Sequence, residues 1–227
     1  MVNAGLDEGM VAAWRRELQE AGRYLIVHGL TWGNAGNLSA RVGPDAYLIT
    51  ASGTRLGELG DNDFVLVSFG GTVEGGPGKK PSKETPMHQA VYEERPEIGA
   101  VVHAAPFYST LLACSRDPLP ADLFVEGMYY LERVGRAAYA HPGSTELGEE
   151  VRAAAHEANV LLLDNHGVLV YDSSVSEALM ATHTLELACH MVVAARSAGM
   201  ALHPLPPAVV RDFLEKSGYR PRREWPE

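Results

Sequence analysis

The stretch from residue 81 to residue 103 constrains this chain most, because it joins a polar helix start to a short apolar strand. Thr85 is a suitable capping residue, and Pro86 suits the first helical turn. Pro96 then ends the helix, because the residue before a proline avoids helical geometry. Residues 100–103 are apolar up to the last one and predict a buried strand. The sequence therefore predicts a helix that is followed closely by a strand.

Polar residues at the two ends of this stretch point to an active site. Ser82, Lys83 and Glu84 precede the helix, and His103 ends the strand. The first turn of a helix offers unpaired backbone N–H groups to an anion, and Lys83 adds a positive charge. Glu84 supplies an acid or base, and His103 supplies an imidazole. We therefore expect an anion site and acid–base groups to meet here.

A second histidine repeats the pattern of His103. Residues 160–163 predict a purely apolar strand, and His166 follows in the next turn, beside Gly167. Imidazoles and a carboxylate such as Glu84 are donors that divalent metal ions prefer. The sequence thus predicts a metal site of Glu84, His103 and His166, with hydrogen-bonded structural histidines as the alternative.

Two tight turns precede the active-site stretch. Gly36 and Asn37 lie in the first turn, and Ser52 and Gly53 lie in the second. Glycine and asparagine suit the left-handed backbone conformations that sharp turns need. Amide nitrogens, hydroxyls and a lysine such as Lys83 are the groups that hold a phosphate. Together with the helix start, the turns predict a phosphate cradle.

The remaining pattern predicts one helix, an antiparallel meander, and then alternating helices and strands. No linker or repeat divides the chain, so we expect residues 1–227 to form a single domain. The predicted helices are residues 7–28, 107–115, 177–198 and 207–216 and one that begins near Ser144; the other predicted strands are residues 38–42, 46–50, 64–69, 72–74, 137–140 and 168–171.

Composition limits the partners and the compartment. The net charge is −10 with a pI near 5.4, which argues against a nucleic-acid partner. Apolar runs are shorter than the ~18 residues that a membrane helix needs, so no membrane partner is expected. The N-terminus lacks the apolar core of a signal peptide, and Cys114 and Cys189 are scattered as in reduced proteins. These features predict a cytoplasmic protein.

Five motifs occur together along the chain. They are Gly33-Asn34-Ala35-Gly36-Asn37-Leu38-Ser39-Ala40-Arg41, Ile49-Thr50-Ala51-Ser52-Gly53, Pro81-Ser82-Lys83-Glu84 with His88, Ala100-Val101-Val102-His103 and Leu163-Asp164-Asn165-His166-Gly167. In this order they resemble the class II aldolase/adducin family, which includes fuculose-phosphate aldolase and ribulose-phosphate 4-epimerase. The resemblance covers roughly residues 8–200. Five ordered motifs are far more specific than any one of them.

The resemblance implies an α/β fold, a three-layer α/β/α domain around a mostly antiparallel central sheet. It also implies a homotetramer with active sites at the subunit interfaces. The expected cofactor is a divalent metal, usually Zn²⁺, with Mn²⁺, Fe²⁺ and Co²⁺ as alternatives. The residues that the resemblance assigns to the phosphate of a small sugar substrate are Gly36, Asn37, Ser52, Gly53, Ser82 and Lys83.

The chain departs from the family at one metal ligand. The family strand ends in two histidines separated by one residue, whereas here Ala105 stands two residues after His103. His166 matches a remaining ligand, but Ala105 has no atom that binds a metal. Either Glu84 completes the set, or His88, one helical turn after Glu84, takes the missing place.

The resemblance favours a metal-dependent lyase that cleaves a ketose phosphate by retro-aldol chemistry through an ene-diolate. Glu84 would move the proton on the carbanion. In the family, a tyrosine of a neighbouring subunit protonates the departing aldehyde oxygen. Tyr129 is the first candidate for this donor, with Tyr130 and Tyr219 as alternatives.

Other functions stay open at this point. Epimerases, dehydratases and decarboxylases of the family share the ene-diolate chemistry. Two histidines and a carboxylate with open positions also fit a non-haem iron oxygenase. Ala105 is compatible with a binding module that has lost catalysis.

Overall fold

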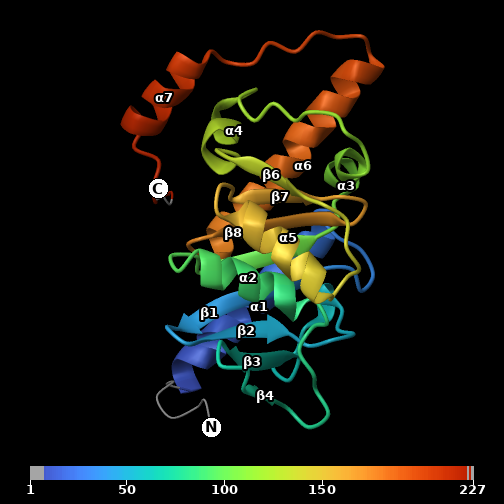
Figure 1. Ribbon diagram of the computed structural model, residues 1–227, viewed down its shortest axis with the longest axis vertical. Helices are drawn as coiled ribbons and strands as arrows, with labels where there is room; N and C mark the ends of the chain where they lie inside the picture. Colours follow the sequence, from blue (N-terminus) through green and yellow to red (C-terminus); the bar gives the residue numbers. More distant parts are fainter. Residues whose placement is uncertain (1–7, 224, 226–227) are drawn as a thin grey trace.

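The computed structural model describes residues 8–223 and 225, and its centre is one sheet of eight strands (Figure 1). The strands are β1 (Asn37–Gly43), β2 (Ala46–Thr50), β3 (Phe64–Ser68), β4 (Val73–Gly75), β5 (Ala100–Ala104), β6 (Val134–Ala137), β7 (Val160–Leu163) and β8 (Gly167–Asp172). The helices are α1 (Glu8–Val27), η1 (Leu56–Glu58), α2 (Thr85–Glu94), α3 (Phe107–Ala113), α4 (Val125–Tyr130), α5 (Thr145–Ala155), α6 (Val175–Ser197) and α7 (Pro207–Lys216). The spatial strand order is β4-β3-β2-β1-β5-β8-β7-β6.

Helices cover both faces of the sheet and give three layers. α2 and α5 pack on one face, and α1 and α6 pack on the other (Figure 1). Side chains alternate between the faces along each strand, so Val101 of β5 joins the core under α2 and α5 while Val102 joins the core under α1 and α6. Neighbouring strands run antiparallel except β6 and β7. The predicted α/β/α architecture with a mostly antiparallel sheet is therefore confirmed.

The strand predicted for residues 137–140 begins and ends earlier than expected. β6 pairs in parallel with β7, from Val134 beside Val160 to Ala137 beside Leu163. Because β7 ends at Leu163, the residues after Ala137 have no partner strand and leave the sheet. The pattern of residues 137–140 could not reveal this, since the pairing depends on a segment far along the chain.

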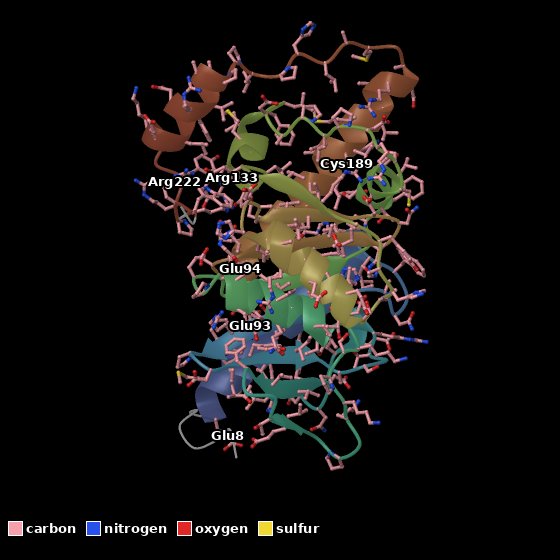
Figure 2. The ribbon with its side chains drawn as sticks, viewed as in Figure 1. Glu8, Glu93, Glu94, Arg133, Cys189 and Arg222 are labelled. Atoms are coloured by element: carbon pink, nitrogen blue, oxygen red, sulfur yellow. The ribbon has the colours of Figure 1, made fainter. Side chains whose placement is uncertain are left out.

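α6 is long and apolar enough to cross a membrane by length and composition, yet it lies in the core. Leu185, Ala188 and Cys189 are buried against the sheet, and Cys189 is labelled on this helix in Figure 2. In its most apolar window, 56% is buried inside the molecule. Burial by the sheet and neighbouring helices thus accounts for the apolar composition of α6.

The C-terminal segment after α7 folds back and is held by polar pairs. Arg223 donates from Nε to the carboxylate of Asp172 at 3.0 Å, and both side chains are at most 5% exposed. Arg222 pairs with Glu132 at 3.1 Å, and Figure 2 shows it close to Arg133. These pairs fix the returning chain beside α4 and the end of β8.

Candidate active site

Strand pairing gathers the predicted site residues on one face of the sheet. His103 points the same way as Val101, two residues earlier in β5, and therefore toward α2. Asn37 lies directly opposite His103 in the antiparallel pair of β1 and β5. His166 lies in the turn between β7 and β8, and β8 is the other neighbour of β5.

Two glycines allow loops to approach β5 closely. A Cβ atom at Gly36 would lie 2.6 Å from the carbonyl oxygen of His103, and one at Gly167 would lie 2.6 Å from that of Ala104. Gly36 also has a φ angle of +84°, which side chains disfavour. Gly36 and Gly167 therefore allow the turn before β1 and the turn that carries His166 to lie against β5.

Glu84 lies at the start of α2 between the two histidines. Its Oε2 is 3.3 Å from Nε2 of His103, and its Oε1 is 3.0 Å from Nε2 of His166. One ligand atom from each of the three residues lies within 4.8 Å of the others. The predicted cap is wrong, because the Thr85 hydroxyl donates to the carbonyl oxygen of Ser82 at 2.7 Å. Glu84 occupies the cap position, but its carboxylate faces the histidines instead of capping the helix.

Electrostatics keep Glu84 ionised. Burial alone would raise the pKa of its carboxyl, but His103, His166 and the hydrogen bond from Asn37 together outweigh burial and lower that pKa to about 2. Burial lowers the pKa of His103. The carboxylate therefore carries its charge at neutral pH, while the buried imidazole beside it favours the neutral form.

The neutral histidine leaves lone pairs that face the carboxylate. Nδ1–H of His103 donates to the carbonyl oxygen of Val168 at 2.9 Å, so Nε2 is the acceptor nitrogen in the neutral ring. Within the described part of the chain, Oε1 of Glu84 and Nδ1 of His166 are buried without a hydrogen-bond partner. The acceptor nitrogen Nε2 of His103 faces a carboxylate, which suits a cation between them, and two imidazoles with a carboxylate are ligands of zinc and similar ions. The residues present therefore fit a divalent metal.

The predicted cradle residues share one cavity of about 320 Å³ with this group. Ser52 and Ser82 lie on neighbouring loops, because the N–H of Ser52 donates to Lys80 and the N–H of Ser82 donates to Thr50. The exposed Lys83 ammonium makes no ion pair with any described residue. The cavity is lined by Gly36, Asn37, Ser52, Gly53, Ser82, Lys83, Glu84, His103 and His166, among others.

Tyr129 does not line this cavity in its own chain. It is buried in α4, where its hydroxyl donates to the carbonyl oxygen of Pro221 at 2.7 Å and lies 3.3 Å from Glu177. Burial raises the pKa of this hydroxyl. Tyr219 packs against the Tyr129 ring, and Tyr130 is its neighbour in α4. None of the three candidate tyrosines lies beside Glu84 within the described chain.

Four further residues complete the description of the site. The alternative that His88 takes the missing ligand place is wrong, because His88 lies outside the group of Glu84, His103 and His166 and reaches the carboxylate only through Asn37. Trp32 and Pro142 line the cavity, and neither carries a chemical group that would have revealed it. Ala105 also lines the cavity near the histidines and offers no ligand atom.

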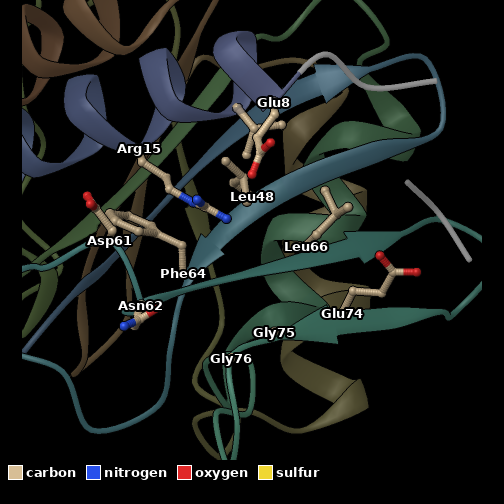
Figure 3. A pocket seen from close by; sticks show the side chains of 11 residues that line it. Glu8, Arg15, Leu48, Asp61, Asn62, Phe64, Leu66, Glu74, Gly75 and Gly76 are labelled. Carbon is tan, nitrogen blue, oxygen red and sulfur yellow. The ribbon is translucent and has the colours of Figure 1, made fainter. Parts of the chain in front are cut away.

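A larger cavity of about 620 Å³ lies elsewhere, between α1 and the hairpin of β3 and β4 (Figure 3). Figure 3 shows Arg15, Asp61 and Glu74 around it, with the apolar Leu48 and Phe64. Its described lining residues include no histidine or cysteine. The smaller cavity, which holds the convergent acid–base and ligand groups, is therefore the candidate active site.

Comparisons with known proteins identify the family of the chain. The family model of the class II aldolase and adducin N-terminal domain matches residues 16–193. The chain is 37% identical over 181 residues to a 5-methylthioribulose-1-phosphate/5-deoxyribulose-1-phosphate aldolase of Rhodospirillum rubrum, covering 79% of this chain and 80% of that protein. It is 36% identical over 179 residues to a 3-oxo-tetronate 4-phosphate decarboxylase of Haemophilus influenzae, covering 77% and 84%.

The fold agrees as well. A solved structure of an L-fuculose 1-phosphate aldolase superposes with a TM-score of 0.83 at 30% sequence identity, covering 92% of this chain and 97% of that one. The matched residues 16–193 include Glu84, His103 and His166. The chain belongs to the class II aldolase and adducin family.

Proposed function

We propose that this class II aldolase-type enzyme is a metal-dependent lyase that cleaves a ketose phosphate or related sugar phosphate by retro-aldol chemistry. The observation that carries the proposal is the convergence of Glu84, His103 and His166 in a cavity that also presents Lys83. Two of the similar proteins are named as aldolases of sugar 1-phosphates, which supports this reaction class.

Glu84, His103 and His166 are the residues that would hold the divalent ion, because Ala105 has no ligand atom. Zinc is our first choice, with Mn²⁺, Fe²⁺ and Co²⁺ as alternatives. When bound, such an ion supplies positive charge that stabilises the negative charge developing on substrate oxygens. Glu84 also moves the proton to or from the carbon at which the bond breaks, since its carboxylate lies at the centre of the group.

The other end of the cavity would hold the substrate phosphate. The Lys83 ammonium supplies charge, and the hydroxyls of Ser52 and Ser82 supply short-range hydrogen bonds. The turns of Gly36-Asn37 and Gly53 bring backbone and amide groups near the same space. The cavity of about 320 Å³ has room for a small phosphorylated sugar between this cradle and the histidines.

We propose a homotetramer with active sites at subunit interfaces. Phe107 of α3 is 69% exposed and Trp32, at the cavity, is 67% exposed, and α6 also exposes Leu187. Large exposed apolar side chains, of which Trp32 lines the cavity, suit burial against a second copy. Tyr129 would then act as proton donor in the site of a neighbouring copy, which requires its hydroxyl to exchange the bond to Pro221 for a substrate oxygen.

The proposed compartment is the cytoplasm. Cys114 is exposed and free, and Cys189 is buried and free. Free thiols are typical of proteins in a reducing compartment.

Decarboxylation is the second candidate function. The similar protein from Haemophilus influenzae is named a decarboxylase of a 3-oxo acid phosphate. Loss of CO₂ from such an acid leaves the same kind of carbanion that retro-aldol cleavage produces, so the same residues serve both reactions. Epimerase and dehydratase reactions share this chemistry, whereas an iron oxygenase would consume O₂ and a binding module would turn over nothing.

The test is a substrate panel with metal-loaded protein. Ketose 1-phosphates are assayed for aldehyde release, and 3-oxo acid 4-phosphates are assayed for CO₂ release. Aldehyde release that a chelator abolishes and added zinc restores is the expected result. CO₂ release without aldehyde release would show that the enzyme is a decarboxylase. O₂ uptake that depends on Fe²⁺ would show that it is an oxygenase. No turnover by metal-loaded protein would contradict the assignment as a lyase.

A further inference from the structure

We propose that His88 and Asn37 are positioning residues for Glu84, and that a one-directional chain of buried hydrogen bonds fixes the orientation of its carboxylate. This inference rests on the proposed function, because it assigns Glu84 the acid–base role. The chain runs from Tyr92 through Ser39, His88 and Asn37 to Glu84.

The chain crosses from α2 to β1 and back. Tyr92 Oη lies 2.8 Å from Ser39 Oγ, which lies 2.7 Å from His88 Nδ1. His88 Nε2 lies 2.5 Å from Asn37 Oδ1, and Asn37 Nδ2 lies 2.6 Å from Glu84 Oε2. His88 and Tyr92 are four residues apart on α2, and Ser39 and Asn37 are two apart on β1, so each pair shares one face of its element.

The bond that Asn37 Nδ2 donates to Glu84 Oε2 sets the direction of every bond in the chain. A carboxylate only accepts, so Asn37 must turn its NH₂ group toward Glu84 and its Oδ1 toward His88. His88 must then donate from Nε2 and accept at Nδ1. Ser39 must donate to Nδ1 and accept from the Tyr92 hydroxyl. Any reversed member would place two acceptors or two donors against each other.

Burial makes this arrangement strict. His88 and Ser39 are fully buried, Tyr92 is 1% exposed and Asn37 is 5% exposed, so water does not replace a lost partner. Burial also lowers the pKa of His88 to about 3, which agrees with a neutral imidazole that donates from one nitrogen and accepts at the other. A charged His88 would donate from both nitrogens and break the order.

The chain leaves defined groups free for the reaction. The Asn37 amide donates to Oε2 of Glu84, whereas Oε1, 3.0 Å from His166 Nε2, accepts no hydrogen bond from a described residue and is open to a cation or proton. The second N–H of the Asn37 amide remains for a ligand, and Asn37 lines the cavity. Asn37 thus connects the predicted phosphate cradle to Glu84, and His88 prevents its amide from rotating.

Two variants of His88 separate positioning from simple packing. In His88→Gln the side-chain amide can donate to Asn37 Oδ1 as the imidazole does, whereas in His88→Leu that donor is lost. We expect His88→Leu to lower kcat and weaken zinc affinity by about 10–100-fold, with KM changed much less, and His88→Gln to stay within a few-fold of the wild type. Equal effects of both variants on kcat and on zinc affinity would overturn the proposal.

NMR of the unmodified protein tests the proposal independently of whether the His88 variants fold. The ¹⁵N shifts of the His88 ring, assigned through its own backbone amide in metal-free protein, report which nitrogen carries the proton. The neutral tautomer protonated at Nε2 at pH 7 is expected. The tautomer protonated at Nδ1, or a doubly protonated ring, would overturn the proposal.

The readouts also separate this inference from the proposed function. If no sugar phosphate is cleaved, the lyase proposal fails, but the ring tautomer and the zinc affinities of His88→Leu and His88→Gln still decide the role of His88. If cleavage occurs and the tautomer is wrong, the lyase stands and the positioning chain fails.

Discussion

At the scale of single residues, the carboxylate of Glu84 faces two imidazoles and one amide donor. Because Ala105 has no ligand atom, we propose two tasks for Glu84, completing the ligand set and moving a proton. We propose a separate task, phosphate binding, for the adjacent Lys83, because its exposed ammonium faces solvent and the cavity instead of another side chain. Substitutions at these neighbouring residues should therefore have different kinetic signatures.

Glu84→Gln is expected to reduce kcat by about 10²–10⁴-fold, because it removes the acid–base group. It should also weaken zinc binding, since an amide lacks the negative charge of the carboxylate. Steady-state kinetics and zinc titration check both effects. The control is Glu149→Gln, at an exposed carboxylate of α5, which should change neither. An active Glu84→Gln protein would contradict the assigned role.

Lys83→Met is expected to raise KM for a phosphorylated substrate by about 10–100-fold with little change in kcat, because hydrogen bonds to charged groups are worth about 1.5–3 kcal/mol. The matched control is Lys80→Met, three residues away and also exposed. Lys83→Met should not affect turnover of an unphosphorylated analogue. If KM is unchanged for the phosphate, Lys83 does not bind it.

At the scale of secondary structure, short and largely apolar strands could be predicted well. β2 and β7 have the predicted bounds, residues 46–50 and 160–163. α2 runs from Thr85 to Glu94, with Pro86 in its first turn and Pro96 just after its end. β6 was misplaced because a parallel partner distant in sequence sets its ends. The approach of Glu84 to both histidines could be predicted from motifs, but the opposition of Asn37 and His103 could not, since strand register depends on the whole sheet.

Gly36 tests how closely β1 and β5 must approach. Gly36→Ala combines a φ angle of +84° with a Cβ atom 2.6 Å from the His103 carbonyl oxygen. Gly71 has a similar φ of +88° but no atom within 4 Å of the added Cβ, so Gly71→Ala isolates the backbone strain. We expect Gly71→Ala to lower the free energy of unfolding by about 1–2 kcal/mol and Gly36→Ala to lower it by more. If urea unfolding gives the same decrease in the free energy of unfolding for both variants, the close contact of Gly36 with the His103 carbonyl oxygen does not limit the residue at position 36.

At the scale of the whole molecule, the site lies where three elements meet: strand β5, the start of α2 and the turn after β7. Buried ionisable groups at this meeting point connect the stability of the fold to pH. The tyrosines of α4 and the C-terminal segment lie outside the cavity, so the single chain holds its ligand and cradle residues but not the proposed donor. The sequence could suggest Tyr129 as a candidate but could not position it, because the pattern of one chain does not contain the contacts of the proposed neighbouring copy.

The metal-free protein is expected to lose stability in acid. His103 and His88 have pKa values that burial lowers from 6.5, so the unfolded chain binds more protons and stability falls as the pH decreases below about 6.5. Glu84, whose pKa is lowered from 4.5 to about 2, adds a second loss as the pH falls through that window. Urea unfolding between pH 7 and pH 3 measures both steps. Glu84→Gln should remove the second step, and an unchanged profile would contradict the ionised carboxylate.

The proposed metal site holds a divalent ion on Glu84, His103 and His166 without a histidine at position 105. Elemental mass spectrometry of the purified protein after zinc loading and dialysis, beside the variants His103→Ala and Ala105→His, tests this site. We expect about one ion per wild-type chain, its loss in His103→Ala and its retention in Ala105→His. No ion in the wild-type protein, with an ion gained only in Ala105→His, would contradict the proposed site.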